Sequence, residues 1–418
     1  MEILRDYYLN KIIGRKHNSL IKVITGIRRS GKSFLLFNLF KNHLLSTGVD
    51  VDHIIEIALD DRRNKEKRDP DYCIEFVTRQ MKDSNMYYLL IDEIQFMDEF
   101  EDVLNTFLHF KNLDVYVTGS NSKFLATDII TEFRGRGDEI HVNPLSFSEF
   151  YNFHQNMNWE DAYNEYRLYG GLPFVSLLNN NEDKENYLKK LFEETYIKDI
   201  VERNKIKDDT QLEVLINIIA SSIGALTNPK KLANTFKSVE HIDISEPTIK
   251  NWLKYIEEAY LIKKSIRYDI KGKKYISTPS KYYFTDLGLR NARLNFRQIE
   301  ETHIMENIIY NELICRGYSV DVGVGEILEK NENNNYVRKQ IEVDFVVNRG
   351  SKRYYIQSAY SLPNIEKRKQ EERPLTNIDD SFKKIIIVKD NVSITRDDNG
   401  IVTMGIKDFL LNDNSLDL

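Results

Sequence analysis

Short apolar runs alternate with helical patterns between Leu20 and about Phe150. The apolar runs are rich in β-branched and aromatic residues, which favour strands, and the helical patterns between them are typical of βαβ units. The expected strands cover residues 21–24, 53–58, 87–91 and 114–118. Three of them lead directly into a polar turn, so the pattern predicts a parallel sheet with functional residues at the carboxyl ends of its strands.

The pattern changes after residue 158. Long helical stretches run from 159 to about 207 and are interrupted once, by the breaker cluster Tyr-Gly-Gly-Leu-Pro at 169–173. Shorter helices follow from 211, and 261–283 suits a hairpin with its turn near Gly272. Beyond Asp286 the pattern predicts a helix at 304–316, strands at 318–324, 342–348, 353–359 and 384–388, and a hairpin loop at the polar run 331–335.

The composition is that of a globular protein of several domains, with 418 residues, 41% hydrophobic and 30% charged. The net charge of −6 gives no overall positive field, so any contact with DNA would have to come from a local basic patch. We expect a cytoplasmic protein with no membrane partner, because no leader pattern or long apolar run is evident. Cys73 and Cys315 lack the spacing of a zinc site and are expected to be free thiols.

The run from Gly26 to Ser33 has the spacing G-x-x-x-x-G-K-[ST] of a phosphate-binding loop, or P-loop. Its glycines allow a tight turn whose backbone N–H groups cradle phosphates, Lys32 neutralises the β- and γ-phosphates, and Ser33 offers its hydroxyl to Mg²⁺. A strand pattern precedes the loop, and the helix expected at 33–40 adds the positive end of its dipole. These features predict a MgATP site. The residues expected at the nucleotide are Gly26, Ile27, Arg28, Arg29, Ser30, Gly31, Lys32, Ser33 and Phe34.

The strand at 87–91 ends in two carboxylates, Asp92 and Glu93, which is the Walker B pattern. Asp92 would hold Mg²⁺ and Glu93 would act as general base on the attacking water. A solvated turn is the alternative interpretation, and the P-loop about sixty residues upstream argues against it.

Two further candidates follow this pair. Ser120 and Asn121 stand at the end of the strand at 114–118, where they could reach the γ-phosphate, although Gly-Ser-Asn is also ordinary turn chemistry. Arg134 and Arg136 flank a glycine; an arginine supplied by a neighbouring copy in a homo-oligomer can stabilise charge in the transition state. A solvated loop is the other interpretation of these arginines.

In this order, the motifs at 26–33, 92–95 and 118–120 resemble those of AAA+ ATPases. Phe-Arg-Gly-Arg at 133–136 and Pro-Leu-Ser-Phe-Ser-Glu-Phe at 144–150 are similar to a prokaryotic AAA+ family whose core precedes a carboxy-terminal domain of unknown function. The turn at 169–173 and the run Tyr-Phe-Thr-Asp-Leu-Gly-Leu-Arg at 283–290 match further signatures of that family. The resemblance covers nearly the whole chain and implies an AAA+ core that binds ATP, but it implies no pathway.

The segments at 229–234 and 245–253, with the hairpin at 261–283, resemble a winged helix-turn-helix. Ser245 can cap the second helix, with Pro247 in its first turn. The hairpin is basic, so it could contact DNA phosphates. Packing against protein is the alternative. The cations of the hairpin are Lys263, Lys264, Arg267, Lys271, Lys273 and Lys274.

The last part of the chain resembles the restriction-endonuclease-like fold, in which a helix glutamate, a strand aspartate and an E-x-K strand surround a divalent metal. Glu312 and Asp344 stand where the first two are expected, and Glu306 lies on the same helix. Gln357 replaces the second-strand acid and Ala359 replaces the lysine. A degenerate fold used for binding or packing is therefore favoured over an active nuclease.

We therefore expect an α/β protein with four parts: an AAA+ P-loop core with a parallel sheet (1–158), a helical lid (159–210), a winged helix-turn-helix (211–288) and a restriction-endonuclease-like domain (289–418). Its expected reaction is hydrolysis of MgATP to ADP and phosphate, coupled to a partner such as DNA. Three alternatives stay open: a switch that binds nucleotide tightly and turns over rarely, an ATP-dependent nuclease, and a DNA-binding regulator.

Overall fold

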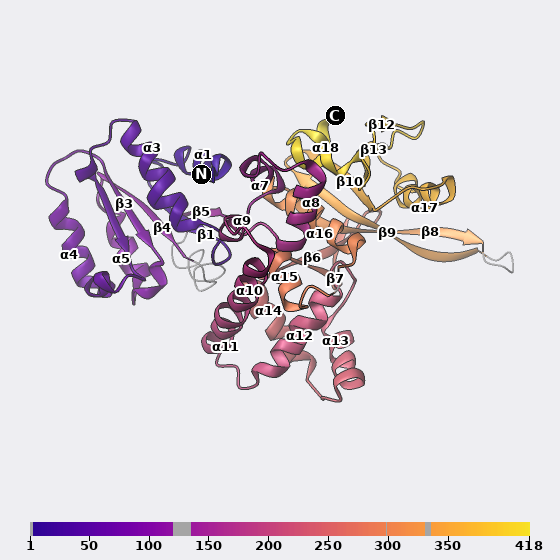
Figure 1. Ribbon diagram of the computed structural model, residues 1–418, viewed down its shortest axis with the longest axis horizontal. Helices are drawn as coiled ribbons and strands as arrows, with labels where there is room; N and C mark the ends of the chain where they lie inside the picture. Colours follow the sequence, from indigo (N-terminus) through magenta and orange to yellow (C-terminus); the bar gives the residue numbers. More distant parts are fainter. Residues whose placement is uncertain (1–2, 120–134, 298, 331–335) are drawn as a thin grey trace. The chain divides into compact units, whose positions relative to one another are not determined.

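The computed structural model describes residues 3–119, 135–297, 299–330 and 336–418 (Figure 1). The chain forms two compact units. Unit 1 comprises Met1–Leu145, Leu172–Phe174 and Glu258–Tyr260, and unit 2 comprises Ser146–Gly171, Val175–Glu257 and Leu261–Leu418. Ser120, Asn121, Arg134 and the predicted loop at 331–335 lie outside the described residues.

Unit 1 is built on a parallel sheet with the strand order β2-β3-β4-β1-β5. β4 lies between β1 and β3, because Lys22 pairs with Tyr116 on one side and Leu90 pairs with Tyr116 on the other. The parallel sheet predicted from the sequence is confirmed, and β5 is an addition. The strands are β1 (Ile21–Thr25), β2 (Ile54–Ala58), β3 (Tyr87–Asp92), β4 (Leu113–Thr118) and β5 (Gly137–His141).

Helices cover both faces of this sheet (Figure 1). Ile21 and Val23 of β1 face a core shared with α4 and α5, whereas Ile24 faces a second core shared with α1, η1 and α3. This alternation follows from the period of two along a strand, and it makes the sheet a buried middle layer. The helices are α1 (Asp6–Ile13), α2 (Lys32–Phe34), the π-helical η1 (Leu35–Phe40), α3 (Lys41–Ser46), α4 (Pro70–Gln80) and α5 (Phe100–Phe107), with 3₁₀ turns η2 (Val51–His53), η3 (Arg62–Arg68) and η4 (Ile94–Phe96).

Unit 2 begins with helices. α7 starts with a capping box, in which the Ser146 hydroxyl accepts the Glu149 N–H and the Glu149 carboxylate accepts the Ser146 N–H. The helices are α7 (Phe147–Phe153), α8 (Trp159–Tyr169), α9 (Pro173–Ser176), α10 (Asn181–Leu191), η6 (Phe192–Ile197), α11 (Lys198–Asn204), α12 (Asp209–Ser221), α13 (Pro229–Thr235), η7 (Phe236–Glu240) and α14 (Glu246–Glu258).

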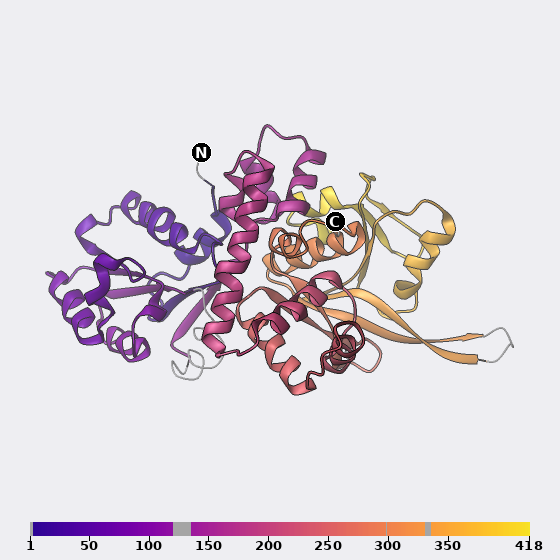
Figure 2. The same ribbon diagram turned by 60° about the horizontal axis from the view of Figure 1, so that its bottom comes forward.

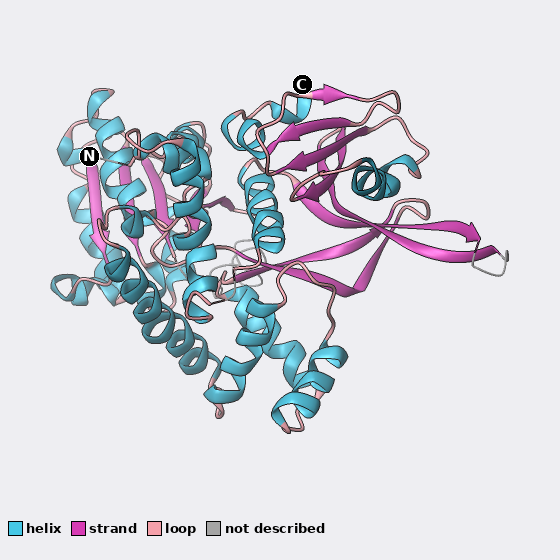
Figure 3. Cartoon of the chain, turned by 45° about the vertical axis from the view of Figure 1, so that its right-hand side comes forward, coloured by secondary structure: helices cyan, strands magenta, loops and turns pink. Residues whose placement is uncertain are grey.

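The strands of unit 2 form one mixed sheet with the order β12-β13-β11-β10-β9-β8-β6-β7 (Figure 3). The β6–β7 hairpin is part of this sheet, because β6 pairs in parallel with β8, so the sheet crosses the boundary predicted at residue 288. β8 and β9 form a long antiparallel ribbon that extends past the other strands (Figure 2). The strands are β6 (Ile262–Asp269), β7 (Lys274–Phe284), β8 (Ser319–Lys330), β9 (Tyr336–Arg349), β10 (Lys352–Ala359), β11 (Lys383–Val388), β12 (Thr395–Arg396) and β13 (Val402–Gly405).

Helices α16 and α17 pack against this sheet. The remaining helices of unit 2 are α15 (Leu287–Arg293), α16 (Glu301–Cys315), α17 (Ile365–Thr376), α18 (Ile406–Leu411) and η8 (Ser415–Asp417). No helix of the described residues is long and apolar enough to cross a membrane. Cys73 is buried, Cys315 is half-buried, and both are free thiols.

Two of the sequence signatures meet at a single contact in unit 2. The Asp286 carboxylate caps α15 by accepting the Leu289 N–H at 3.0 Å, and its other oxygen accepts the Gly171 N–H at 2.8 Å. Gly288 is required there, because a Cβ would lie 2.0 Å from the carbonyl oxygen of Tyr169. The runs at 169–173 and 283–290 therefore serve packing in this structure.

Candidate functional site

The P-loop connects β1 to α2 and lies at the carboxyl edge of the parallel sheet. Two of its glycines have backbone angles that other residues rarely adopt: φ is 137° at Gly26 and 90° at Gly31. At Gly26 a Cβ would also lie 2.1 Å from the carbonyl oxygen of Val142, which follows β5. The loop can take this path only with glycine at that position.

Lys32 is buried inside the loop with only 4% of its surface exposed. Its Nζ donates to the carbonyl oxygens of Gly26 and Ile27, both at 3.0 Å. Burial lowers the pKa of Lys32 to about 8, although Glu93 and Asp92 oppose that shift. The ammonium therefore contacts neutral carbonyls, and the carboxylates act on it only through longer-range electrostatic attraction. Because no carboxylate of the described residues contacts it, the ammonium is suited to bind an anion.

Asp92 ends β3 and is 4% exposed. The hydroxyl of Thr118, the last residue of β4, donates to Asp92 Oδ1. Burial raises the pKa of Asp92, and hydrogen bonds from Thr118 and Ser33 oppose that shift. The structure therefore brings together the P-loop serine and the Walker B aspartate, which come from strands on either side of β4.

Glu93 follows Asp92 with a left-handed backbone, at φ 53°. Its N–H donates to Thr118 Oγ1 at 3.1 Å, and Gln95 Nε2 donates to its carboxylate. Thr118 thus braces both acidic residues at once. The sequence analysis assigned no role to Thr118. The strand order would have indicated one, because it places the end of β4 between the P-loop and the Walker B strand.

The other predicted residues are more scattered. Arg28 is half-buried, Arg29 is exposed, and Phe34 is 37% exposed. Arg136 is exposed and immediately precedes β5, whose first residue, Gly137, pairs with Ile21 at the start of β1. Arg136 therefore lies at the amino edge of the sheet, opposite to the P-loop of its own chain.

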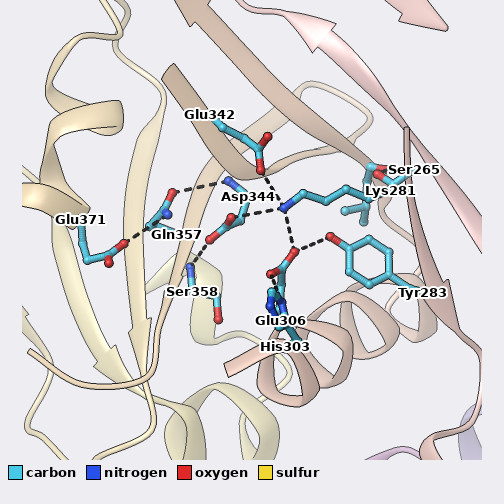
Figure 4. Close-up of polar contacts among 11 residues, drawn as sticks. Ser265, Lys281, Tyr283, His303, Glu306, Glu342, Asp344, Gln357, Ser358 and Glu371 are labelled. Carbon is cyan, nitrogen blue, oxygen red and sulfur yellow. Dashed lines mark hydrogen bonds and ion pairs between the residues drawn. The ribbon is translucent and has the colours of Figure 1, made fainter. Parts of the chain in front are cut away.

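A second lysine–carboxylate cluster lies in unit 2 (Figure 4). Lys281 of β7 is 3% exposed, and its Nζ lies 2.9 Å from Glu306 Oε1, 2.8 Å from Glu342 Oε1 and 3.6 Å from Asp344 Oδ1. Tyr283 donates to Glu306 at 2.6 Å. Burial alone would lower the pKa of Lys281, but the three carboxylates outweigh it and raise the pKa. In the same cluster burial raises the pKa of Asp344 to about 7.

Asp344 lies on β9, and two residues of the neighbouring strand β10 contact it on the side away from Lys281 (Figure 4). Asp344 Oδ2 accepts the Ser358 N–H at 2.9 Å, and Gln357 Oε1 accepts the Asp344 N–H at 3.4 Å. Gln357 Nε2 donates to Glu371 of α17 at 3.2 Å. Asp344 and Gln357 are therefore neighbours.

Glu312 is not part of that cluster. It forms an ion pair with Arg316 at 2.8 Å, within α16. The helix glutamate that reaches Asp344's surroundings is Glu306, six positions earlier. Six residues correspond to about 600° of helical rotation, so the two glutamates cannot face the same direction.

The two clusters differ in their fit to a divalent cation. Ser33 and Asp92 offer a hydroxyl and a carboxylate, which are the hard oxygen donors that Mg²⁺ prefers, and Mg²⁺ keeps several waters. Around Asp344, the ammonium of Lys281 already occupies the space between the carboxylates. Within the described ranges, no group of three or more His, Cys, Asp or Glu side chains is placed to hold a metal ion.

Two known families match parts of the chain between residues 18 and 300, and two relatives match nearly all of it. Residues 18–151 match a family described as an AAA domain, and residues 160–300 match a domain of unknown function (DUF8612). A protein of Haemophilus influenzae is 34% identical and covers 98% of both chains. A protein of Methanocaldococcus jannaschii is 31% identical, covering 94% of this chain and 86% of its own length.

Among solved structures, the Walker-type ATPase of Pyrococcus abyssi is 15% identical, with a TM-score of 0.48 over 70% of this chain and 96% of that one. The AMPPCP-bound DnaA of Aquifex aeolicus is 14% identical, with a TM-score of 0.31 over 60% of this chain and 86% of that one.

Proposed function

The chain belongs to one family of AAA-domain proteins with these relatives from Haemophilus influenzae and Methanocaldococcus jannaschii, and we propose that it is an ATPase that hydrolyses MgATP to ADP and phosphate. The observation that carries this proposal is the convergence of Lys32, Ser33, Asp92 and Glu93 at the carboxyl edge of the sheet. A buried ammonium held only by carbonyls, beside two carboxylates, is what a triphosphate with its cation requires.

Each residue of the nucleotide site would have a role that follows from its chemistry. Lys32 would exchange its two carbonyl partners for phosphate oxygens, and the N–H groups of the loop would cradle the same phosphates. Ser33 and Asp92 would hold Mg²⁺, which neutralises phosphate charge when bound. Glu93 would accept a proton from the attacking water, and Thr118 would keep both acidic residues in place.

Binding and turnover measured on three variants test this proposal. Lys32→Ala should abolish ATP binding, whereas Glu93→Gln should keep binding and lower turnover by about 10²- to 10⁴-fold. Lys41→Ala is the matched control, because Lys41 begins α3 and forms a half-buried ion pair with Glu56. Unchanged ATP binding in Lys32→Ala would overturn the proposal. A wild-type turnover below about 10⁻³ s⁻¹, as in unassisted switch GTPases, would favour the nucleotide-dependent switch.

We propose DNA as the partner, through a winged helix. The element order α12, α13, α14, β6, β7 and the antiparallel bridge between Thr227 and Ser280 support that form, because the segment between the first two helices pairs with the last strand. The outer face of α14 exposes Lys250, Asn251 and Lys254. The hairpin exposes four further lysines: Lys264, Lys271, Lys273 and Lys274.

Binding of a labelled duplex at several salt concentrations tests the DNA partner. Replacement of the four exposed hairpin lysines by glutamine should weaken binding and flatten its dependence on salt, by a slope of about 0.9 for each DNA phosphate that the hairpin no longer neutralises. Replacement of Lys65 and Lys111, which are exposed in unit 1, is the control. If the hairpin variant and the control variant bind the duplex equally well, the hairpin does not contact DNA and serves packing instead.

We propose that the carboxy-terminal part has a degenerate restriction-endonuclease-like fold with a role in binding or packing. Lys281 among the carboxylates and Ala359 at the position of the usual lysine support this role. Incubation of the protein with plasmid DNA, ATP and Mg²⁺ or Mn²⁺ tests it. Cleavage that disappears in Asp344→Ala but persists in the exposed-site control Glu326→Ala would establish the ATP-dependent nuclease instead.

A further inference from the structure

We propose that Arg5 is a positioning residue for the P-loop, which it holds with the Gly31 N–H directed toward the phosphates of ATP. This inference rests on the proposed function, because it assigns a residue to the same nucleotide site. Arg5 lies outside every motif of the sequence and reaches the loop from the segment before α1.

The contacts of Arg5 are those of a buried clamp. Only 3% of the residue is exposed, its Nη1 donates to the Ser30 carbonyl at 2.9 Å, and its Nη2 donates to the Asn143 carbonyl at 2.8 Å. The guanidinium also lies over the ring of Tyr8, 4.7 Å from its centroid. A guanidinium is rarely buried without such partners, and its planar fork can bind two carbonyls whose positions it then fixes relative to each other.

The contact with Ser30 sets the orientation of a phosphate-binding group. A peptide bond is planar and trans, so the Ser30 carbonyl and the Gly31 N–H point in opposite directions. Since Arg5 holds the carbonyl on its own side, the Gly31 N–H is turned away from Arg5. A Cβ at Gly31 would lie 3.9 Å from Arg5 Nη1, and φ there is 90°, a conformation in which a glycine peptide could otherwise rotate at little cost.

Asn143, which accepts the second hydrogen bond from Arg5, is itself held in place by Tyr8. Tyr8 Oη accepts hydrogen bonds from the Asn143 N–H at 3.1 Å and from Asn143 Nδ2 at 3.2 Å. The carbonyl of Arg5 in turn accepts the N–H groups of Tyr8 and Leu9 at the start of α1. The P-loop is therefore tied to two other segments of unit 1, the start of α1 and the residues after β5.

This geometry makes a quantitative prediction. Without Arg5, the Ser30–Gly31 peptide is free to turn its carbonyl toward the phosphates, which replaces an attractive N–H with a repulsive oxygen. We expect Arg5→Met to raise Kd and KM for ATP about 10- to 100-fold, the effect of losing hydrogen bonds from a charged group. The turnover number kcat should change much less, because this contact serves bound ATP and its transition state alike.

The experiment compares Arg5→Met, Arg5→Lys and Arg15→Met by ATP titration, steady-state kinetics and thermal unfolding without nucleotide. Arg15 is the matched control. It lies just after α1, forms an ion pair with Asp138 and, among the described residues, has no hydrogen bond to the P-loop. Arg5→Lys keeps the charge and one donor, so it should recover part of the affinity. It also keeps the test informative if Arg5→Met does not fold.

Three outcomes separate the two proposals. If Lys32→Ala abolishes ATP binding and Arg5→Met raises Kd at least tenfold in the folded fraction, the clamp is supported. If Lys32→Ala abolishes binding but Arg5→Met and Arg5→Lys bind within twofold of the wild type, this inference is wrong and the proposed function stands, even if both variants melt earlier. If Lys32→Ala still binds ATP, the proposed function itself has failed.

Discussion

Lys32 in unit 1 and Lys281 in unit 2 are both buried near carboxylates, and the two lysines are in opposite electrostatic states. Lys32 in unit 1 is held by two carbonyl oxygens, and burial lowers its pKa to about 8. Lys281 in unit 2 contacts Glu306 and Glu342 directly, and carboxylates raise its pKa. The same two kinds of group are present in both places, so composition alone does not distinguish the sites.

The difference lies in which charges are already matched. Around Lys281 the counter-charges touch the ammonium, so this lysine already has its electrostatic partners without an added anion. Around Lys32 the carboxylates act from a distance while the contacts are neutral, so the ammonium gains a full electrostatic partner only when an anion binds. A site prepared for a ligand is therefore recognised by the charge that its own residues leave unmatched.

Removal of the two lysines should affect the free energy of unfolding very differently, and this is the largest effect that we predict. Lys281→Met leaves buried carboxylates without their cation and should lower the free energy of unfolding by about 3–5 kcal/mol. Lys32→Met removes an ammonium that burial disfavours, so it should leave that free energy unchanged or raise it. Denaturant unfolding of both variants measures the difference.

The double variant Lys281→Met with Asp344→Asn is the control for this interpretation. It removes one of the stranded carboxylates, so it should recover part of the lost stability. If Lys281→Met and Lys32→Met destabilise the protein equally, the contrast between the two lysines does not hold.

Thr118 sharpens the picture of the nucleotide site. Thr118→Val removes the hydroxyl that binds Asp92 and the Glu93 N–H but preserves the side-chain shape. Because these two acidic residues act on Mg²⁺ and water, we expect kcat to fall about 10- to 100-fold with little change in Kd for ATP. Thr118→Ser keeps the hydroxyl and should remain near the wild type. An equal loss in both variants would mean that the methyl group, and not the hydroxyl, is what matters.

The lowered pKa of Lys32 gives a pH dependence that Lys281 cannot give. Unbound Lys32 loses its proton above about pH 8, whereas bound phosphates favour the charged form. Affinity for ATP should therefore fall by up to about tenfold per pH unit above pH 8. Calorimetric titration from pH 7 to pH 9.5 measures this, and Lys32→Arg, which stays charged, should abolish the slope. A constant Kd across that range would contradict the assignment.

Loss of the Lys32 proton lowers the affinity for ATP but raises the free energy of unfolding of the protein without nucleotide. The folded pKa of Lys32 lies below the value of about 10.4 in an unfolded chain, so the unfolded state binds more protons between the two values. The destabilisation due to Lys32 is complete below pH 8 and disappears as the pH rises toward 10.4. Relative to Lys32→Met, the wild type without nucleotide should therefore gain stability over that window.

Local patterns in the sequence predicted the parallel sheet and the two motifs at its edge. The strands at 21–24, 87–91 and 114–118 are confirmed within one or two residues, because buried parallel strands are continuous apolar runs. The P-loop and Asp92 could be predicted to lie close together because each stands at the carboxyl end of a strand of the same parallel sheet. Chemistry that depends on contiguous residues is visible in a single chain.

Contacts between distant segments could not be predicted in this way. Arg5 meets Ser30 after 25 positions, and Lys281 meets Glu306 after 25 positions across a strand and a helix. The sequence does not show that Glu306, and not Glu312, lies in the cluster with Asp344, since only the packing of α16 decides which of its faces meets β9. The position of Lys281, on β7, among carboxylates of α16 and β9 likewise depends on the sheet order.

Gln357 gives the smallest predicted effect and tests the boundary of the Lys281 cluster. Its amide joins Asp344 at 3.4 Å to Glu371 at 3.2 Å, and both bonds are long and half-buried. Gln357→Ala should therefore lower the free energy of unfolding by less than about 1 kcal/mol and leave ATP turnover unchanged. Glu371→Gln, which keeps the shape of the neighbouring side chain, should have a similarly small effect. A loss as large as that of Lys281→Met would place Gln357 at the centre of the cluster, and the stabilisation would then depend on the neutral amide as much as on the charge of Lys281.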